Sequence, residues 1–165
     1  MSSVSQTLAA GASLLIQTQG LASQASQVGS AQLTTAGAVS GFAVYQNPNS
    51  GQEAVVPLEA GAVNSYTLVF DNTNNLATGV ALANSSTSQI SIPVTLRDDT
   101  GAALGTGSIA LPAHGHTSFM LTDQFPAAAN VRGSVEFDSG GAQIGVIGIR
   151  ATAAGAYTTI PAMAQ

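Results

Sequence analysis

The chain has 165 residues, of which only 7% are charged, and its three Lys or Arg and eight Asp or Glu give a formal net charge of −5. Nucleic acids and anionic membrane surfaces bind clusters of cations, so three scattered arginines exclude both as partners. The lack of cysteine excludes disulfides, thiol catalysis and cysteine-bound metals.

Residues 1–7 are predicted to form an N-terminal tail that is disordered or makes an interaction, and residues 8–165 to form a single domain. The stretch 8–16 is apolar, but no basic residue precedes it, which argues against a signal peptide. No apolar run reaches the 18 residues of a membrane span, so we expect no membrane insertion.

Apolar and polar side chains alternate along residues 66–70, 90–97 and 134–138, which is the period-two pattern of strands with one buried face. Residues 42–45 and 144–149 are apolar on both faces and predict strands at the centre of a sheet. Pattern and composition thus favour strands along most of the chain.

Segments rich in Asn, Asp, Ser and Gly separate these strands and favour tight turns. They lie at 47–51, 71–75, 98–101 and 138–141. Only residues 123–130 favour a helix, and it is short. Pro93 interrupts a strand pattern, which predicts a sheet edge or a bulge. Short strands at this spacing predict an all-β fold, a β-sandwich of the jelly-roll or immunoglobulin-like type.

The chain is similar to itself at an offset of 104 residues, which lays residues 8–58 on 112–162 without a gap. Glycine marks backbone geometry that other residues adopt poorly, so the shared glycines matter most. They are Gly11/Gly115, Gly29/Gly133, Gly37/Gly141, Gly41/Gly145 and Gly51/Gly155. We expect one compact sandwich with an internal pseudo-repeat, its two halves closing around a central hairpin region, 62–111. The alternative is a section of a tandem array of period 104.

Asp71, Thr73 and Asn75 have the one-three-five spacing of a calcium-binding loop. The helix–loop–helix version needs glycine at its sixth position, where this chain has Leu76. A β-sandwich type of calcium site would instead combine Asp71 with a distant carboxylate, Asp98 or Asp99. Turn formation explains the same residues without a metal, so calcium is the one cofactor that the sequence allows and none is required.

For two further motifs, a structural role explains the residues better than metal binding or catalysis. His114 and His116 would share one face of a strand and could bind one metal, but a third ligand is missing and an exposed strand start explains them. Ser139, within Asp138–Gly141, resembles a serine-protease nucleophile loop, yet it matches Thr35 in the other half of the repeat. A hairpin turn is the better interpretation.

Tyrosines are the remaining candidates for ligand binding, because sugar rings stack on exposed aromatic side chains and this chain has no tryptophan. Tyr66 belongs to an alternating apolar set and is predicted to lie in the core. Tyr45 and Tyr157 are therefore the two candidate sugar-binding residues.

Several segments, taken together, are similar to a known group of domains. They are Gly41–Val44, Phe70–Asn72, Gly79–Asn84, Arg97–Asp99, Leu111–Pro112, Gly115–Phe119, Gly133–Phe137, Gly148–Arg150 and Ile160–Pro161. They resemble an uncharacterised Ala/Gly-rich all-β domain found in secreted and cell-surface proteins of soil bacteria. This domain typically lies at the end of long multidomain proteins. The resemblance spans about residues 8–162. It implies a β-sandwich and an extracellular setting, and it supplies no catalytic residues.

The sequence therefore favours a non-catalytic structural or adhesive module, located outside the cell or on its surface, that self-assembles into a filament or layer. Low surface charge weakens the repulsion that keeps proteins monomeric. The expected partners are further copies of the chain or neighbouring domains of a longer secreted protein. The alternative is a carbohydrate-binding module, with or without calcium, whose partner is a glycan.

Overall fold

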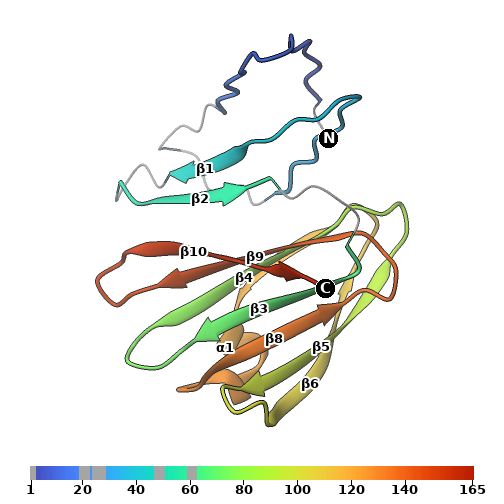
Figure 1. Cartoon of the computed structure of the whole chain (residues 1–165). Coiled ribbons are helices and arrows are strands. Elements are labelled where there is room, and N and C mark those ends of the chain that lie inside the picture. The colour runs from blue at the N-terminus through green and yellow to red at the C-terminus, as the bar shows by residue number, and fades with distance from the viewer. Residues whose placement is uncertain (1–2, 19–22, 24–28, 47–50, 59–62) are drawn as a thin grey trace.

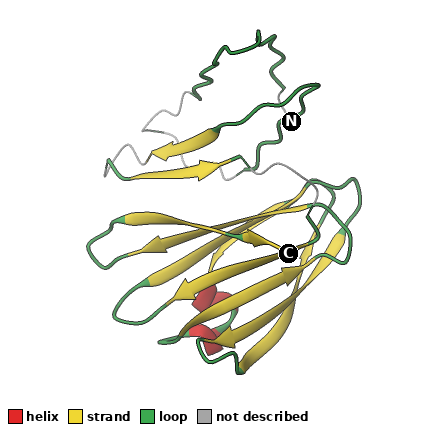
Figure 2. Ribbon diagram, in the orientation of Figure 1, coloured by secondary structure: helices red, strands yellow, loops and turns green. Residues whose placement is uncertain are grey.

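The computed structural model describes residues 3–18, 23, 29–46, 51–58 and 63–165, and this part of the chain is nearly all strand and loop (Figures 1 and 2). Two short helical segments, α1 (Leu121–Gln124) and η1 (Pro126–Ala128), interrupt the strands. The strands are β1 (Phe42–Gln46), β2 (Glu53–Pro57), β3 (Ser65–Asp71), β4 (Ala77–Asn84), β5 (Ile90–Asp98), β6 (Ala103–Leu111), β7 (His116–Met120), β8 (Arg132–Asp138), β9 (Ile144–Ala151), β10 (Tyr157–Pro161) and β11 (Met163–Ala164).

Strands β3 to β11 form two antiparallel sheets that pack as a β-sandwich (Figure 1). One sheet has the order β11-β3-β8-β5-β6 and the other the order β10-β9-β4-β7. The chain changes sheet between most consecutive strands, so each sheet is built from strands that are distant in sequence. The all-β prediction is confirmed at this level.

The core follows the alternating pattern of the sequence. Along β3, Tyr66, Leu68 and Phe70 are buried, whereas the side chains between them face outward. Leu68 meets the opposite sheet at Gly148 of β9, where an added Cβ would lie 2.5 Å from a Leu68 methyl carbon. Apolar residues from both sheets thus interdigitate in one cluster, and Tyr66 lies in the core as predicted.

The helical segment lies where the sequence favours one, but it is broken. Residues 121–124 form a single α-helical turn and residues 126–128 a 3₁₀ turn, because Pro126 cannot continue the first helix. Pro93 lies in β5 beyond the last residue that pairs with β8, which is Val94. It therefore lies at a local edge on the side of β8 only, because β5 is an inner strand and Pro93 stays opposite Ser108 of β6.

The described residues of 3–58 contribute no strand to the two sheets of the sandwich, and we call them the N-terminal arm. Within its described residues, the only strands are β1 and β2, which pair with each other in a separate two-stranded sheet. The prediction of a central strand at 42–45 is wrong, because four of the five residues of β1 are exposed. Residues 3–7 are exposed and without regular structure, while residues 1–2 lie outside the described part.

The sandwich therefore spans residues 65–164, whereas the sequence predicts one sandwich over 8–165. The two predicted halves also differ in shape. Residues 112–162 supply β7, both helical segments, β8, β9 and β10, but the described parts of 8–58 contain only the β1–β2 hairpin. The predicted closure of both halves around 62–111 is thus not found.

Both halves cannot close around 62–111 because the strands of this region can pair with only one of the two halves. Strand β4 already pairs with β7 on one side and with β9 on the other, so no edge of it is free for the arm. The arm is also less suited to pair with these strands than residues 112–162, because it has polar side chains at two positions that are buried in the sandwich. Buried Leu121 and Ile144 correspond, at the offset of 104, to Gln17 and Ser40.

Candidate interaction site

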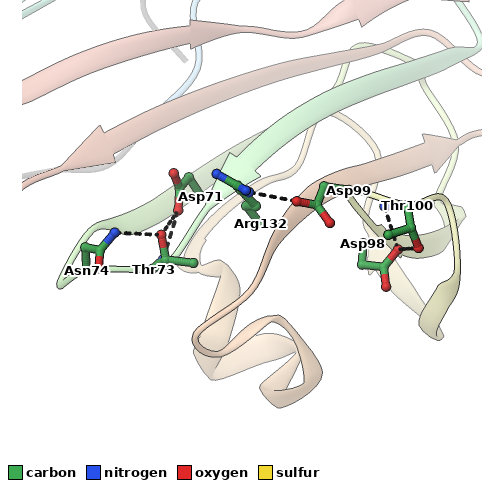
Figure 3. Close-up of polar contacts among 7 residues, drawn as sticks. All are labelled: Asp71, Thr73, Asn74, Asp98, Asp99, Thr100 and Arg132. Carbon is green, nitrogen blue, oxygen red and sulfur yellow. Dashed lines mark hydrogen bonds and ion pairs between the residues drawn. The ribbon is translucent and has the colours of Figure 1, made fainter.

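A group of polar loops gathers at one end of the sandwich. The β3–β4 turn, the β5–β6 turn and the loop before β8 surround a depression of about 380 Å³. Its lining residues are Thr73, Asn74, Asp99, Asn130, Val131 and Arg132. This polar loop cluster contains or adjoins the three carboxylates that the sequence singles out for calcium (Figure 3).

The Asp71 carboxylate accepts hydrogen bonds from within its own turn. Its Oδ1 accepts hydrogen bonds from the Thr73 hydroxyl, at 2.6 Å, and from the Thr73 backbone N–H, at 2.9 Å. The side-chain bond from Thr73 is the largest cause that lowers the pKa of Asp71, and the Arg132 and Arg150 charges add smaller effects. The carboxylate is thus kept ionised by local donors.

Asp98 and Asp99 serve different partners. Asp98 accepts bonds from the hydroxyl and N–H of Thr100 and from the N–H of Ala102, and the Thr100 hydroxyl is the main cause that lowers its pKa. Asp99 forms an ion pair with Arg132 at 2.7 Å, which raises the pKa of the guanidinium. Both partners of this pair are largely exposed, so it contributes little stability.

The guanidinium of Arg132 lies between Asp71 and Asp99 (Figure 3). A fixed cation there occupies the position from which a metal ion would have to reach both carboxylates. Among the described residues, no group of three or more His, Asp or Glu lies together in a way that could hold a metal ion. The calcium site stays a prediction that the geometry does not support.

The two candidate tyrosines lie on different hairpins. Tyr45 is in β1 and 56% exposed, and Tyr157 begins β10 and is 42% exposed. Strand β2, the partner of β1, lies alongside β10, although the two strands are not hydrogen-bonded neighbours (Figure 1). Neither tyrosine is among the residues that line the polar loop cluster or the depression beside β6.

A second depression, of about 340 Å³, lies between β6 and the helical segments. Phe125 forms its floor and lies against Gly107, where an added Cβ would be 2.7 Å from the ring. This contact fixes the close approach of the helical segment to β6, as expected for a glycine within a strand. The lining combines glycines, polar side chains and the apolar Leu96, Phe125, Pro126 and Ala127, with no carboxylate or imidazole among the residues that form it.

His114 and His116 do not share a strand. His114 has a positive φ of 53° and lies in the turn that the Gly115 N–H closes by donating to Pro112 O. His116 is the first residue of β7. The Ser139 hydroxyl donates to the backbone oxygens of Asn64 and Ala142, so it holds a turn together, in agreement with the hairpin interpretation.

Two buried asparagines hold the ends of β4, and the sequence does not distinguish them from turn residues. Asn72 accepts from the Thr78 N–H at 2.8 Å and donates to Ala128 O at 3.0 Å. Asn84, only 3% exposed, donates to Ser88 O and to Pro112 O, each at 2.8 Å. These amides replace lost backbone pairing at strand ends, which identifies them as structural residues.

The N-terminal arm is the most unusual surface of the chain. The whole chain exposes 10756 Å², whereas a compact monomer of this mass exposes about 7,500 Å². In the described residues, twelve large hydrophobic side chains of the arm are exposed, against Val69, Tyr157 and Met163 in the sandwich. The twelve are Val4, Leu8, Leu14, Leu15, Ile16, Leu33, Val39, Phe42, Val44, Tyr45, Val55 and Leu58. Among the described residues, the exposed large apolar side chains are thus concentrated on the arm.

Comparisons with other proteins add no assignment. The chain matches no protein-family model, no curated protein and no solved structure. Within the described residues, no helix is long and apolar enough to cross a membrane.

Proposed function

We propose that the chain is a non-catalytic extracellular module with a structural or adhesive role, and that it self-assembles through its N-terminal arm. The observation that carries this is the set of exposed apolar side chains on the arm. Covering apolar surface is favourable by roughly 25 cal/mol per Å², so these side chains favour an assembly that buries them. A surface with 7% charged residues offers little repulsion against such contacts.

The sandwich supplies a second surface for assembly. Strand β6 is the outer strand of the five-stranded sheet, and its sequence, ALGTGSIAL, has neither a charge nor a proline. Edge strands in soluble proteins commonly carry charged residues or proline, which prevent pairing with another chain. An arm-to-edge contact joins two different surfaces, so repeating it generates a filament or layer rather than a closed dimer.

The order of the strands favours the immunoglobulin-like alternative over the jelly roll. In that fold, strand B pairs with E, while G, F and C are consecutive in the second sheet. Here β3 pairs with β8, and β10, β9 and β4 are consecutive. Domains of this architecture commonly serve as extracellular spacers and adhesion modules, which agrees with the resemblance to domains of secreted proteins.

The test is analytical ultracentrifugation of the full chain across a range of concentrations. Phe42 and Val44 lie on one face of β1, so the variant Phe42→Asp/Val44→Asp places two charges on the arm. We expect concentration-dependent assembly of the wild type and loss of it in this variant. Val69→Asp is the matched control, because Val69 is 48% exposed and Val44 51%. A wild type that stays monomeric at every concentration would refute self-assembly.

A carbohydrate-binding role is the second candidate, favoured by the exposure of both Tyr45 and Tyr157. A glycan array, probed with and without a calcium chelator, tests it. Binding that Tyr45→Ala and Tyr157→Ala both remove would support this role. No binding to any glycan would exclude it, and loss of binding with the chelator alone would bring calcium back into consideration.

A further inference from the structure

The edge strands of the three sheets differ in how well they are protected against pairing with another chain. Natural proteins protect such edges with charged residues, with proline or by keeping the strand very short. Strand β2 carries Glu53 and Pro57, β10 ends with Pro161, β7 begins with His116, and β11 has two residues. Among the described edge strands, only β1 and β6 are longer than two residues and free of charged residues, histidine and proline.

On the arm, the unprotected edge belongs to β1. Its partner β2 lies alongside β10, and Ala54 and Val56 of β2 are buried. No described strand pairs with the other side of β1. Phe42 and Val44 share one face of β1, and more than half of each side chain is exposed. Strand β1 therefore offers an open edge together with apolar side chains.

On the sandwich, β6 offers a surface that fits such a strand. Gly105 and Gly107 share the face of β6 that carries buried Ile109, and both line the depression of about 340 Å³ above Phe125. The Phe125 ring fills the space at Gly107, but a Cβ added at Gly105 would meet nothing within 4 Å. An apolar side chain from a strand placed beside β6 therefore has room here and an aromatic ring to contact.

We propose that β1 of one copy pairs with β6 of a second copy and turns Phe42 and Val44 toward the depression beside Gly105 and Gly107. This rests on the proposed function and deepens it by naming the two strands that meet. A chain in this form does not make the contact with itself, because β1 and β6 lie on opposite sides of the molecule (Figure 1). Since two different edges meet, every copy can pair at both, and repetition extends a filament.

The exposed surface of the chain is large enough for this contact. Standard interfaces between proteins bury about 1,600 Å² in total, half from each partner. The chain exposes 10756 Å², which is about 3,000 Å² more than a compact monomer of its mass exposes. Addition of a strand to a sheet edge also forms backbone hydrogen bonds, which add to the burial of apolar side chains.

Cross-linking between cysteines tests which edges meet, because the chain has no cysteine of its own. Val44→Cys marks β1, Gly105→Cys marks β6, and Ser118→Cys marks the exposed edge β7 as the matched control. Pairs of these variants are mixed at a concentration at which the wild type assembles and treated with a short bismaleimide. We expect links between positions 44 and 105 to exceed those between 44 and 118 by about 10-fold or more, because neighbours across paired strands lie within roughly 8 Å.

The other outcomes separate this inference from the proposed function. An excess of links between two copies of position 44, or of position 105, would show that like edges meet and would overturn the proposal while self-assembly stands. An assembling wild type whose links between 44 and 105 stay at the level of the control would do the same. A wild type that is monomeric at every concentration would refute the proposed function, and this inference with it.

Gly105→Asp provides a second test that needs no cross-linker. The single chain has room for this side chain, because an added Cβ meets nothing at Gly105, so the melting temperature of the dilute chain should stay unchanged. We expect assembly to weaken by about 10-fold or more, since the paired form would bury the new carboxylate without a partner. Ser118→Asp places the same charge on β7 and should leave assembly unchanged. Equal assembly of Gly105→Asp and the wild type would overturn the proposal.

Discussion

Gly133 of β8 lies so close to Arg97 of β5 that a Cβ added at position 133 would overlap the Arg97 carbonyl oxygen. Gly133 pairs with Asp98 of β5 on one side and with Phe70 of β3 on the other. The ladder between β5 and β6 shifts register between Leu96 and Arg97, beside this contact. Only a residue without a Cβ can occupy position 133.

We therefore expect Gly133→Ala to destabilise the sandwich by about 2–3 kcal/mol, because the backbone of a central strand has to move to relieve the overlap. Urea unfolding measures the change. Gly29→Ala in the arm is the control and should leave the unfolding free energy of the sandwich unchanged, since its surroundings are open. Equal effects of both substitutions would contradict the account of this contact.

Asn84 joins three segments at the end of β4. Its side chain bonds the Ser88 and Pro112 carbonyls and accepts from the N–H and hydroxyl of Ser86. Asn84→Ala removes these bonds and leaves the Ser86 N–H without its acceptor, while Pro112 O keeps its bond from the Gly115 N–H, so we expect a loss of about 2 kcal/mol in unfolding free energy. Thermal or urea unfolding tests this, with Asn64→Ala at an exposed position as the control. A loss below that of the control would show that water replaces the amide.

The parts of the fold that follow from local pattern could be predicted from the sequence. Alternation along 66–70, 90–97 and 134–138 predicts β3, β5 and β8. The arm could not be predicted in the same way. Residues 42–45 are as apolar as a central strand, and burial depends on whether a partner sheet is free, which no local pattern records.

For the candidate site, too, local turns could be predicted from the sequence, but contacts between distant loops could not. The turn chemistry of Asp71 and Asp98 is readable from the residues that follow them, and the structure has the corresponding hydrogen bonds to Thr73 and Thr100. That Arg132 would come to lie between Asp71 and Asp99 depends on the packing of distant loops (Figure 3). Spacing along the chain predicts a metal loop equally well with or without that arginine.

Asp71 and Asp98, the two aspartates in turns, make the stability of the folded chain depend on pH in the acidic range. The pKa values of Asp71 and Asp98 are lowered in the folded chain, so their contribution is present above the unfolded value of about 3.9 and is lost as pH falls through the folded values. We expect Asp71→Asn/Asp98→Asn to lower the melting temperature at pH 7 and to narrow the difference between pH 7 and pH 3. Asp123→Asn, at an exposed position, is the control. An unchanged acid dependence would place its origin elsewhere.

His114 holds a left-handed backbone conformation, with φ of 53°, in the turn between β6 and β7. This conformation costs an L-residue roughly 1–2 kcal/mol, and glycine avoids it while losing about 0.5–1 kcal/mol to its greater freedom when unfolded. We expect His114→Gly to stabilise the chain by about 0.5 kcal/mol, provided that its N–H keeps its bond to Ser86 O. His116→Gly, within β7, should instead destabilise it, because glycine weakens a strand. Opposite signs in a urea titration confirm that the two histidines occupy a turn and a strand, and a loss of stability in both would contradict it.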